Sequence, residues 1–311
     1  MKLKFLSWTL LALCLGSCSS GGGNEEDLLP PTPEPEPEKP LLVKLNCQVG
    51  APESRATDYG FEKGDAIGIY MVNYKDGAAG TLQPAGNHAD NLRFTYDATW
   101  TPDTPLYWQD TETKADFYLY YPYSGSVTDL HAHAVDIPTD QSTEAAYKQG
   151  DFLWGKTGGV APTEQAVSIT AHHVFSSTVV KVKAGNGFTE ETLAAADVSV
   201  CLNGLRHQAT VDLATGNASS VGEVSSIIPL KEADGWRAIV APQTVEREGL
   251  VTITVDGKAY NLTQDENNPQ FTFQAGKRHT FTITVSKTSS GVNVDIGAWE
   301  DDGIDHGGVA E

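Results

Sequence analysis

The stretch VTITVDGKAYNL occupies residues 251–262. Its first half alternates valine or isoleucine with threonine, the period of a strand with one buried face. Asp256-Gly257 follows, and this pair favours a two-residue type I′ hairpin turn. Tyr260 and Leu262 continue the alternation on a return strand. The stretch therefore predicts an antiparallel β-hairpin.

Similar patterns recur on both sides of this hairpin. Further strands are predicted at residues 41–49, 66–72, 117–121, 198–203 and 279–285. Many short strands separated by turn residues are typical of antiparallel β-sandwiches. Only residues 190–196 have the pattern of a helical turn, and the sequence shows no internal repeat. The fold class predicted from these patterns is all-β.

The length and composition fit two domains. The chain has 311 residues, of which 40% are hydrophobic and 20% are charged, enough apolar material for two cores. We expect the break near residue 164, in the polar stretch 158–165. This gives an N-terminal β-sandwich at residues 41–164 and a C-terminal β-sandwich at residues 165–311.

The charge balance excludes one class of partner. Lys and Arg number 21 against 41 Asp and Glu, so the formal net charge is −20. A polyanion such as nucleic acid repels a chain of this charge. We therefore expect no nucleic-acid partner.

The beginning of the chain has the features of an export signal. Two lysines precede an apolar run at residues 5–15, which is too short to span a membrane but fits a signal peptide. The run ends in LGSC, which resembles the lipobox of bacterial lipoproteins. Residues 1–17 are then the signal peptide, cleavage falls between Ser17 and Cys18, and Cys18 carries the lipid. An ordinary secretory signal is the alternative.

Residues 18–40 are predicted to be a tether. Glycines at 21–23 are followed by alternating proline and glutamate at 30–38. This composition favours an extended, self-repelling chain that holds the folded domains away from the lipid surface. A low-complexity stretch without purpose is the alternative. Beyond the tether only Cys47 and Cys201 remain, and nothing in the sequence requires them to pair.

Several motifs in a fixed order resemble the fimbrillin superfamily, the lipoprotein subunits of type V pili and related surface fibres in Gram-negative gut and oral anaerobes. After the lipobox, they are SRAT at 54–57, FEKGDAIGIY at 61–70, YW at 107–108, ADFYLYYPY at 115–123, DFLWG at 151–155, HHVFS at 172–176, FQAGKRHTF at 273–281 and IGAW at 296–299. The resemblance implies two tandem transthyretin-like β-sandwich domains and a non-enzymatic, adhesive role at the outer membrane and in the fimbrium.

The resemblance also implies processing. In such pilins a protease removes the first strand, and a neighbour's strand fills the vacancy. Here the cut would fall between Arg55 and Ala56, in a turn-like stretch that follows the strand at 41–49. The displaced strand would carry Val43, Leu45, Cys47 and Val49. Burial of its aliphatic residues contributes about 5–9 kcal/mol, which rivals the stability of a domain. The alternative is that Arg55 is a loop arginine and the strand is retained.

A donor strand is expected near the end of the chain. Val292, Val294 and Ile296 alternate there, but the tail at 300–311 is acidic and rich in glycine. Such a tail is poor material for an apolar groove. The tail thus differs from the long C-terminal donor segment expected of a major stalk subunit. This difference favours an accessory, tip or anchor subunit. The partners expected are other fimbrillin subunits, outer-membrane lipid through Cys18, and a host or bacterial surface ligand.

Enzyme, metal and glycan sites are weighed against these expectations. The sequence has no nucleophile elbow, HExxH or phosphate-binding loop, so we expect no catalytic residue and no cofactor. Histidines at 131, 133, 172 and 173 and the acidic stretch 301–305 lack a full ligand set, so we expect no metal. The second function class is an outer-membrane glycan-binding lipoprotein. It would need exposed aromatic residues, whereas Trp108, Tyr118, Tyr120 and Trp154 are most simply core residues.

Overall fold

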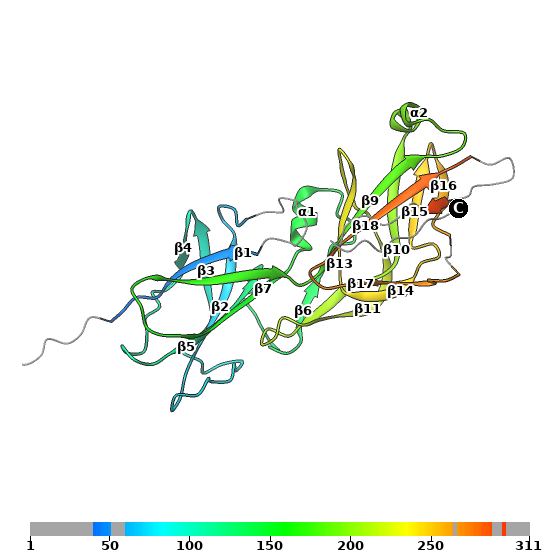
Figure 1. Ribbon diagram of the computed structural model, residues 1–311. Coiled ribbons are helices and arrows are strands. Elements are labelled where there is room, and N and C mark those ends of the chain that lie inside the picture. Colours follow the sequence, from blue (N-terminus) through cyan, green and yellow to red (C-terminus); the bar gives the residue numbers. More distant parts are fainter. Residues whose placement is uncertain (1–39, 51–59, 264–265, 288–293, 297–311) are drawn as a thin grey trace, which may run out of the picture. The chain divides into compact units, whose positions relative to one another are not determined.

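A seven-stranded sheet organises the first part of the chain. The computed structural model describes residues 40–50, 60–263, 266–287 and 294–296. The strand order of this sheet is β1-β8-β7-β5-β2-β3-β4 (Figure 1). The strands are β1 (Lys44–Val49), β2 (Ala66–Asn73), β3 (Ala89–Asp97), β4 (Thr99–Pro102), β5 (Ala115–Tyr121), β7 (Leu153–Val160) and β8 (Ala166–His173).

Both faces of this sheet are covered at its centre. Along β2, Ile67 and Ile69 face one apolar cluster, whereas Tyr70 and Val72 face another. This explains why β2 and β5 read as continuous apolar runs and not as alternating ones. The first cluster holds the side chains that β1 buries.

Two further sheets enclose a third core. One contains β11 (Ala218–Ile227), β10 (Val198–Val211), β15 (Val251–Val255) and β16 (Lys258–Asn261), with β6 (His133–Asp136) also paired to β10. The other contains β12 (Leu230–Glu232), β13 (Gly235–Val240), β9 (Ser176–Ala184), β18 (Arg278–Val285) and β19 (Val294–Ile296). A separate pair consists of β14 (Gln243–Glu246) and β17 (Gln270–Phe273). The apolar faces of these strands form one buried cluster.

The hairpin predicted at 251–262 is confirmed. Strands β15 and β16 pair antiparallel from Thr252↔Asn261 to Val255↔Lys258. Asp256 and Gly257 both have positive φ, at 48° and 80°, as a type I′ turn requires. The prediction of a mainly β chain is also confirmed: the described residues contain two short helices, α1 (Glu144–Gln149) and α2 (Glu190–Ala195).

Three sequence predictions need correction. The pairing is not antiparallel throughout, because β1–β8 and β9–β18 are parallel. The first part of the chain is one continuous sheet, not two separate sheets. The sequence patterns did not predict the helix α1, because the six residues after its N-cap Thr143 are too few to show helical periodicity.

The expected break near residue 164 does not coincide with a change of sheet. Strand β8 follows it and still belongs to the first sheet, while β6 precedes it and pairs with β10. One apolar cluster takes Tyr118 and Tyr120 from one side of residue 164 and Val211 and Ile239 from the other. Trp154 Nε1 also donates a hydrogen bond of 2.8 Å to the Leu213 carbonyl. Residues on both sides of residue 164 thus share a core.

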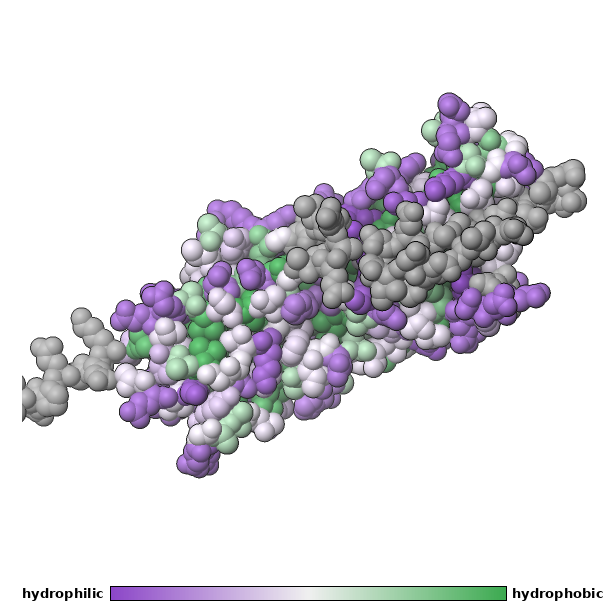
Figure 2. All heavy atoms as spheres, in the orientation of Figure 1, coloured by the Kyte–Doolittle hydropathy of each residue, from purple (hydrophilic) through white to green (hydrophobic). Residues whose placement is uncertain are grey.

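No helix in the described part of the chain is long and apolar enough to cross a membrane. The face drawn in Figure 2 mixes hydrophilic and hydrophobic residues across the described elements.

Candidate functional site at the first strand

The first strand completes the core of the first sheet. Strand β1 pairs with β8 from Lys44↔Ala166 to Val49↔Ala171. Val43, Leu45 and Cys47 are buried, while the residues between them are exposed. Val49 is half-buried and lies at the end of the strand. The structure therefore confirms the half-buried strand predicted at 41–49.

Hydrogen bonds also hold this segment from its other side. The Val43 N–H donates to the Leu106 carbonyl at 2.8 Å, and the Trp108 N–H donates to the Leu41 carbonyl at 2.9 Å. Trp100 Nε1 donates to the Cys47 carbonyl at 3.2 Å. Residues 41–43, just before β1, thus have backbone partners of their own, while β1 itself has its backbone ladder with β8 and a side-chain donor at the Cys47 carbonyl.

We call the apolar residues that β1 covers the β1-binding surface. They belong to the same buried cluster as Leu45, and they are Trp100, Leu106, Trp108, Val167 and Ile169. Two of them are tryptophans, which carry large apolar areas. Without β1, this surface and the unpaired edge of β8 would both face water, and such an edge invites strand addition.

A recess opens beside the end of β1, and we call it the end recess. The lining residues that decide its chemistry are Val49, Phe61, Glu62, Tyr121, Lys148 and Asp151. Its cavity volume is about 50 Å³, and it is open to solvent on one side. Phe61 connects it to the β1-binding surface, since its ring meets Trp100 edge-on with centroids 4.9 Å apart.

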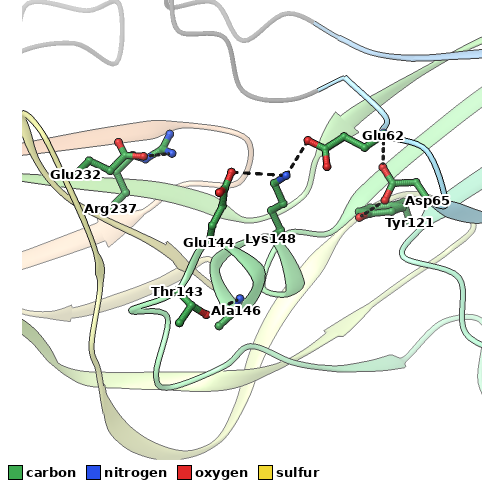
Figure 3. Close-up of polar contacts among 9 residues, drawn as sticks. All are labelled: Glu62, Asp65, Tyr121, Thr143, Glu144, Ala146, Lys148, Glu232 and Arg237. Carbon is green, nitrogen blue, oxygen red and sulfur yellow. Dashed lines mark hydrogen bonds and ion pairs between the residues drawn. The ribbon is translucent and has the colours of Figure 1, made fainter. Parts of the chain in front are cut away.

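Figure 3 shows the polar contacts at the rim of the end recess. Lys148 Nζ lies 2.7 Å from Glu62 Oε1 and 3.7 Å from Glu144 Oε1. Asp65 accepts a hydrogen bond from the Glu62 N–H at 2.7 Å and another from the Tyr121 hydroxyl at 3.1 Å. Burial, reinforced by the carboxylate of Asp65, raises the pKa of Tyr121. Tyr121 therefore stays a neutral donor.

A half-buried ion pair lies at the acidic wall. Asp151 Oδ1 lies 2.9 Å from His173 Nδ1. Burial alone would lower the pKa of His173, but the hydrogen bond and the charge of Asp151 outweigh burial, so this pKa is raised. Asp151 thus has His173 as a partner beside the recess.

The helix α1 supplies one side of the end recess. The Thr143 hydroxyl accepts a hydrogen bond from the Ala146 N–H at 3.2 Å (Figure 3), an N-cap contact that starts the helix. Tyr147 on the same helix packs under the guanidinium of Arg237, which pairs with Glu232. A threonine followed by glutamate and two alanines was the sequence signal available for this helix.

Several predicted site residues lie outside the described residues. They are Ser17 and Cys18 at the signal cleavage site, Arg55 and Ala56 at the processing site, and Val292 of the donor segment. Val294 and Ile296 belong to β19, which pairs antiparallel with β18 from Val285↔Val294 to Ile283↔Ile296. In this structure the candidate donor segment thus extends a sheet of its own chain.

The histidines have separate structural places. His131 forms an ion pair with Asp212 at 3.1 Å. His133 is buried between the rings of Tyr120 and Phe152, and burial lowers its pKa. Across the residues that the structure describes, no group of three or more His, Cys, Asp or Glu side chains could hold a metal ion.

The cysteines and aromatic residues also have structural places. Cys47 and Cys201 are both free thiols, and burial raises the pKa of Cys47. Trp108, Tyr118 and Tyr120 are buried, as expected of core residues. Tyr107, 41% exposed, is the aromatic side chain that the described residues leave open to solvent.

Comparisons with known proteins agree with one another. A family model described as "Fimbrillin-like" matches residues 54–299. The chain is 29% identical over 314 residues to "Putative fimbrium subunit Fim1C" of Bacteroides uniformis, covering 96% of each chain. It is 27% identical over 171 residues to "Putative fimbrium tip subunit Fim1C" of Bacteroides ovatus, covering 49% of this chain and 29% of that protein.

Solved structures share the fold. A "putative cell adhesion protein" from Bacteroides uniformis aligns with a TM-score of 0.61 and 24% identity, covering 84% of this chain and 97% of that chain. Another from Bacteroides ovatus aligns with a TM-score of 0.65 and 20% identity, covering 86% and 98%. With the family model spanning both parts of the chain, the conclusion is that this protein belongs to the fimbrillin-like family and is not an enzyme.

Proposed function

We propose that this protein is exported as a lipid-anchored precursor and that the processed chain is a fimbrium subunit, joined to its neighbours by strand exchange at the β1-binding surface. The observation that carries the proposal is the position of β1. Its buried Leu45 and Cys47, with Val43 just before them, complete a core that the other six strands leave open, and its sequence lies just before Arg55. A cut between Arg55 and Ala56 would separate this strand from the rest of the chain.

The donor in this proposal is the segment with Val292, Val294 and Ile296. Its described part makes a short ladder with β18, which an exchange would replace by pairing with a neighbouring subunit. The neighbour's strand would bury its alternating side chains where Val43 and Leu45 now lie. Addition of a strand to an open edge is a general mode of association, with backbone hydrogen bonds for affinity and side-chain contacts for specificity.

We further propose an accessory, tip or anchor role. The acidic, glycine-rich tail at 300–311 supports it, because such a tail would fill an apolar groove poorly. The relative from Bacteroides ovatus whose name includes "tip subunit" supports it as well. Immunogold labelling would test this role. We expect label at fibre ends or at the cell surface, and uniform label along the shaft would contradict it.

N-terminal sequencing of protein recovered from the cell surface tests the strand exchange itself. We expect a mature start at Ala56 in assembled fibres, and a lipid on Cys18 in the unprocessed form. An Arg55→Gln variant serves as the control, since it removes the cationic side chain that a trypsin-like protease requires. A start only at lipidated Cys18, in fibres that assemble normally, would show that β1 is retained.

A further inference from the structure

The end recess is continuous with the β1-binding surface. Val49 at the end of β1 forms part of its lining. Phe61 forms another part and packs on Trp100, whose indole N–H holds β1 at the Cys47 carbonyl. If β1 is removed, the part of the recess wall that Val49 forms is removed with it. The recess then lies at one end of the site that β1 has vacated. Whatever strand replaces β1 must place a side chain there.

The chemistry of the end recess suits a long cationic side chain. Phe61, Tyr121 and Leu153 supply apolar walls, and the charged lining residues are Glu62, Asp65, Asp151 and Lys148. Three carboxylates face the ammonium of Lys148 and the imidazole of His173, which pairs with Asp151, so at least one formal negative charge is in excess. Apolar walls accommodate the aliphatic stem of Arg or Lys, while the rim meets its charged head.

The side chain of Val49 can contact the apolar walls of the recess but cannot pair with its charged rim. This side chain is aliphatic and short, and the next residue, Gly50, has none to offer. The backbone at Gly50 is fixed, since its N–H donates to the Ala171 carbonyl at 2.7 Å. The recess therefore holds an acidic rim that the chain's own first strand does not engage.

We propose that the end recess selects the incoming strand of a neighbouring subunit by binding an Arg or Lys side chain at the position of Val49. This inference rests on the strand exchange proposed above and names the chemistry of its partner. At the position of Val49, the chain's own first strand then binds more weakly than a donor strand with Arg or Lys there. The donor's cation pairs with the rim carboxylates, whereas Val49 cannot.

A first test uses the full chain and does not depend on exchange. Val49→Arg and Val49→Glu variants are compared by thermal unfolding at low salt. We expect the Arg variant to melt about 2–4 °C higher than the Glu variant, the shift that about 1 kcal/mol produces in a chain of this size. The same pair of substitutions at exposed Gln48 is the matched control, and we expect it to show little difference.

The rim carboxylates supply the second arm of this test. Glu62→Gln also frees Lys148 from its nearest carboxylate partner, so it should reduce or reverse the advantage of Arg at position 49. Asp151→Asn should reduce it, and Glu223→Gln on the distant strand β11 should not change it. Equal melting of the Val49→Arg and Val49→Glu variants would overturn the end recess as a cation site and leave strand exchange untouched.

A peptide experiment tests the partner. The full chain is cut at Arg55, and labelled peptides of residues 41–50 with Arg or Glu in place of Val49 compete for the β1-binding surface. We expect the Arg peptide to exchange about fivefold more, the effect of an ion pair worth about 1 kcal/mol. Exchange of both peptides to the same extent would overturn the selection. If neither peptide exchanges, strand exchange itself is wrong, and the selection falls with it.

Discussion

The first and the last described strands are attached to the molecule in different ways. Strand β1 has six residues, lies parallel to β8 and buries Leu45 and Cys47 in the core, beside the buried Val43 that precedes it. Strand β19 has three residues and pairs with β18 through Val294 to Ile296. The core beneath β18 is already formed by strands on its other side, because Ile283 and Val285 pack with β9 and β10 residues.

This difference separates two roles that one chain can hold. A strand that completes a core leaves a specific vacancy when it is removed, so its site can receive a neighbour. A short ladder at the edge of a sheet whose core is already complete can be exchanged with little loss of folding free energy. This contrast supports the proposal that a neighbour's strand is accepted at the site of β1 and that the segment with β19 is the one donated.

The largest effect is expected from removal of β1. A variant with a specific protease site in place of residues 52–57 is cut, and the released strand is washed away. Val43, Leu45 and Cys47 are buried, so we expect the free energy of unfolding to fall by about 4–7 kcal/mol. Denaturant unfolding measures this loss. A loss below about 2 kcal/mol would show that β1 does not complete the core.

Cys47 reports the departure of β1 directly. Its thiol is buried and its pKa is raised, so little thiolate forms and alkylation stays slow at pH 8 while β1 is in place. Once the strand is free, its thiol should react as readily as an exposed cysteine. Cys201, which is half-buried on β10, is the internal reference.

A single substitution gives the next effect. Leu45→Ala removes a buried side chain between Val43 and Cys47 and leaves a cavity, so we expect a loss of about 2–5 kcal/mol. Urea unfolding of the intact chain measures it. Asn46→Ala, one residue on and exposed, is the matched control and should change stability by less than about 0.5 kcal/mol. Equal effects of the two substitutions would break the distinction between the two faces of β1.

The smallest effect is expected at the other end of the chain. Deleting residues 294–311 removes a ladder of three paired residues, and we expect a loss of about 1–2 kcal/mol. Thermal and denaturant unfolding beside the β1-excised protein compare the two ends. A loss as large as that from removing β1 would mean that β19 also completes a core, and the contrast between the two strands would disappear.

Local patterns predicted much of this architecture. Alternation predicted β1 and the β15–β16 hairpin, because each has one buried face and the hairpin has a turn whose residues fix its geometry. The order of the motifs indicated the family. Parallel pairing of β1 with β8 could not be read from either strand, since it depends on which distant segment lies beside it. The same dependence on distant partners explains why residue 164 does not mark a change of sheet.

Sequence patterns could not predict the end recess. Its residues come from four separate segments, and the alternation of β1 marks Val49 only as one more buried position. Glu62 and Lys148 are ordinary surface residues by type, and only the helix α1 brings their charges to 2.7 Å. The short α1 lacks the length from which helical periodicity is recognised.

The parallel pairing of β1 also has a consequence for the order of folding. Leu45 pairs with Val167, about 120 residues later in the chain. Closing so long a loop has a high entropic cost, and contacts of high sequence separation form slowly. Although β1 leaves the ribosome first, it can dock only after β8 has been made and the intervening strands have assembled. A folding chain is therefore expected to pass through a state in which the β1-binding surface has formed but is vacant, and the covalent link to β1 then gives the chain's own strand the advantage of proximity over any competitor.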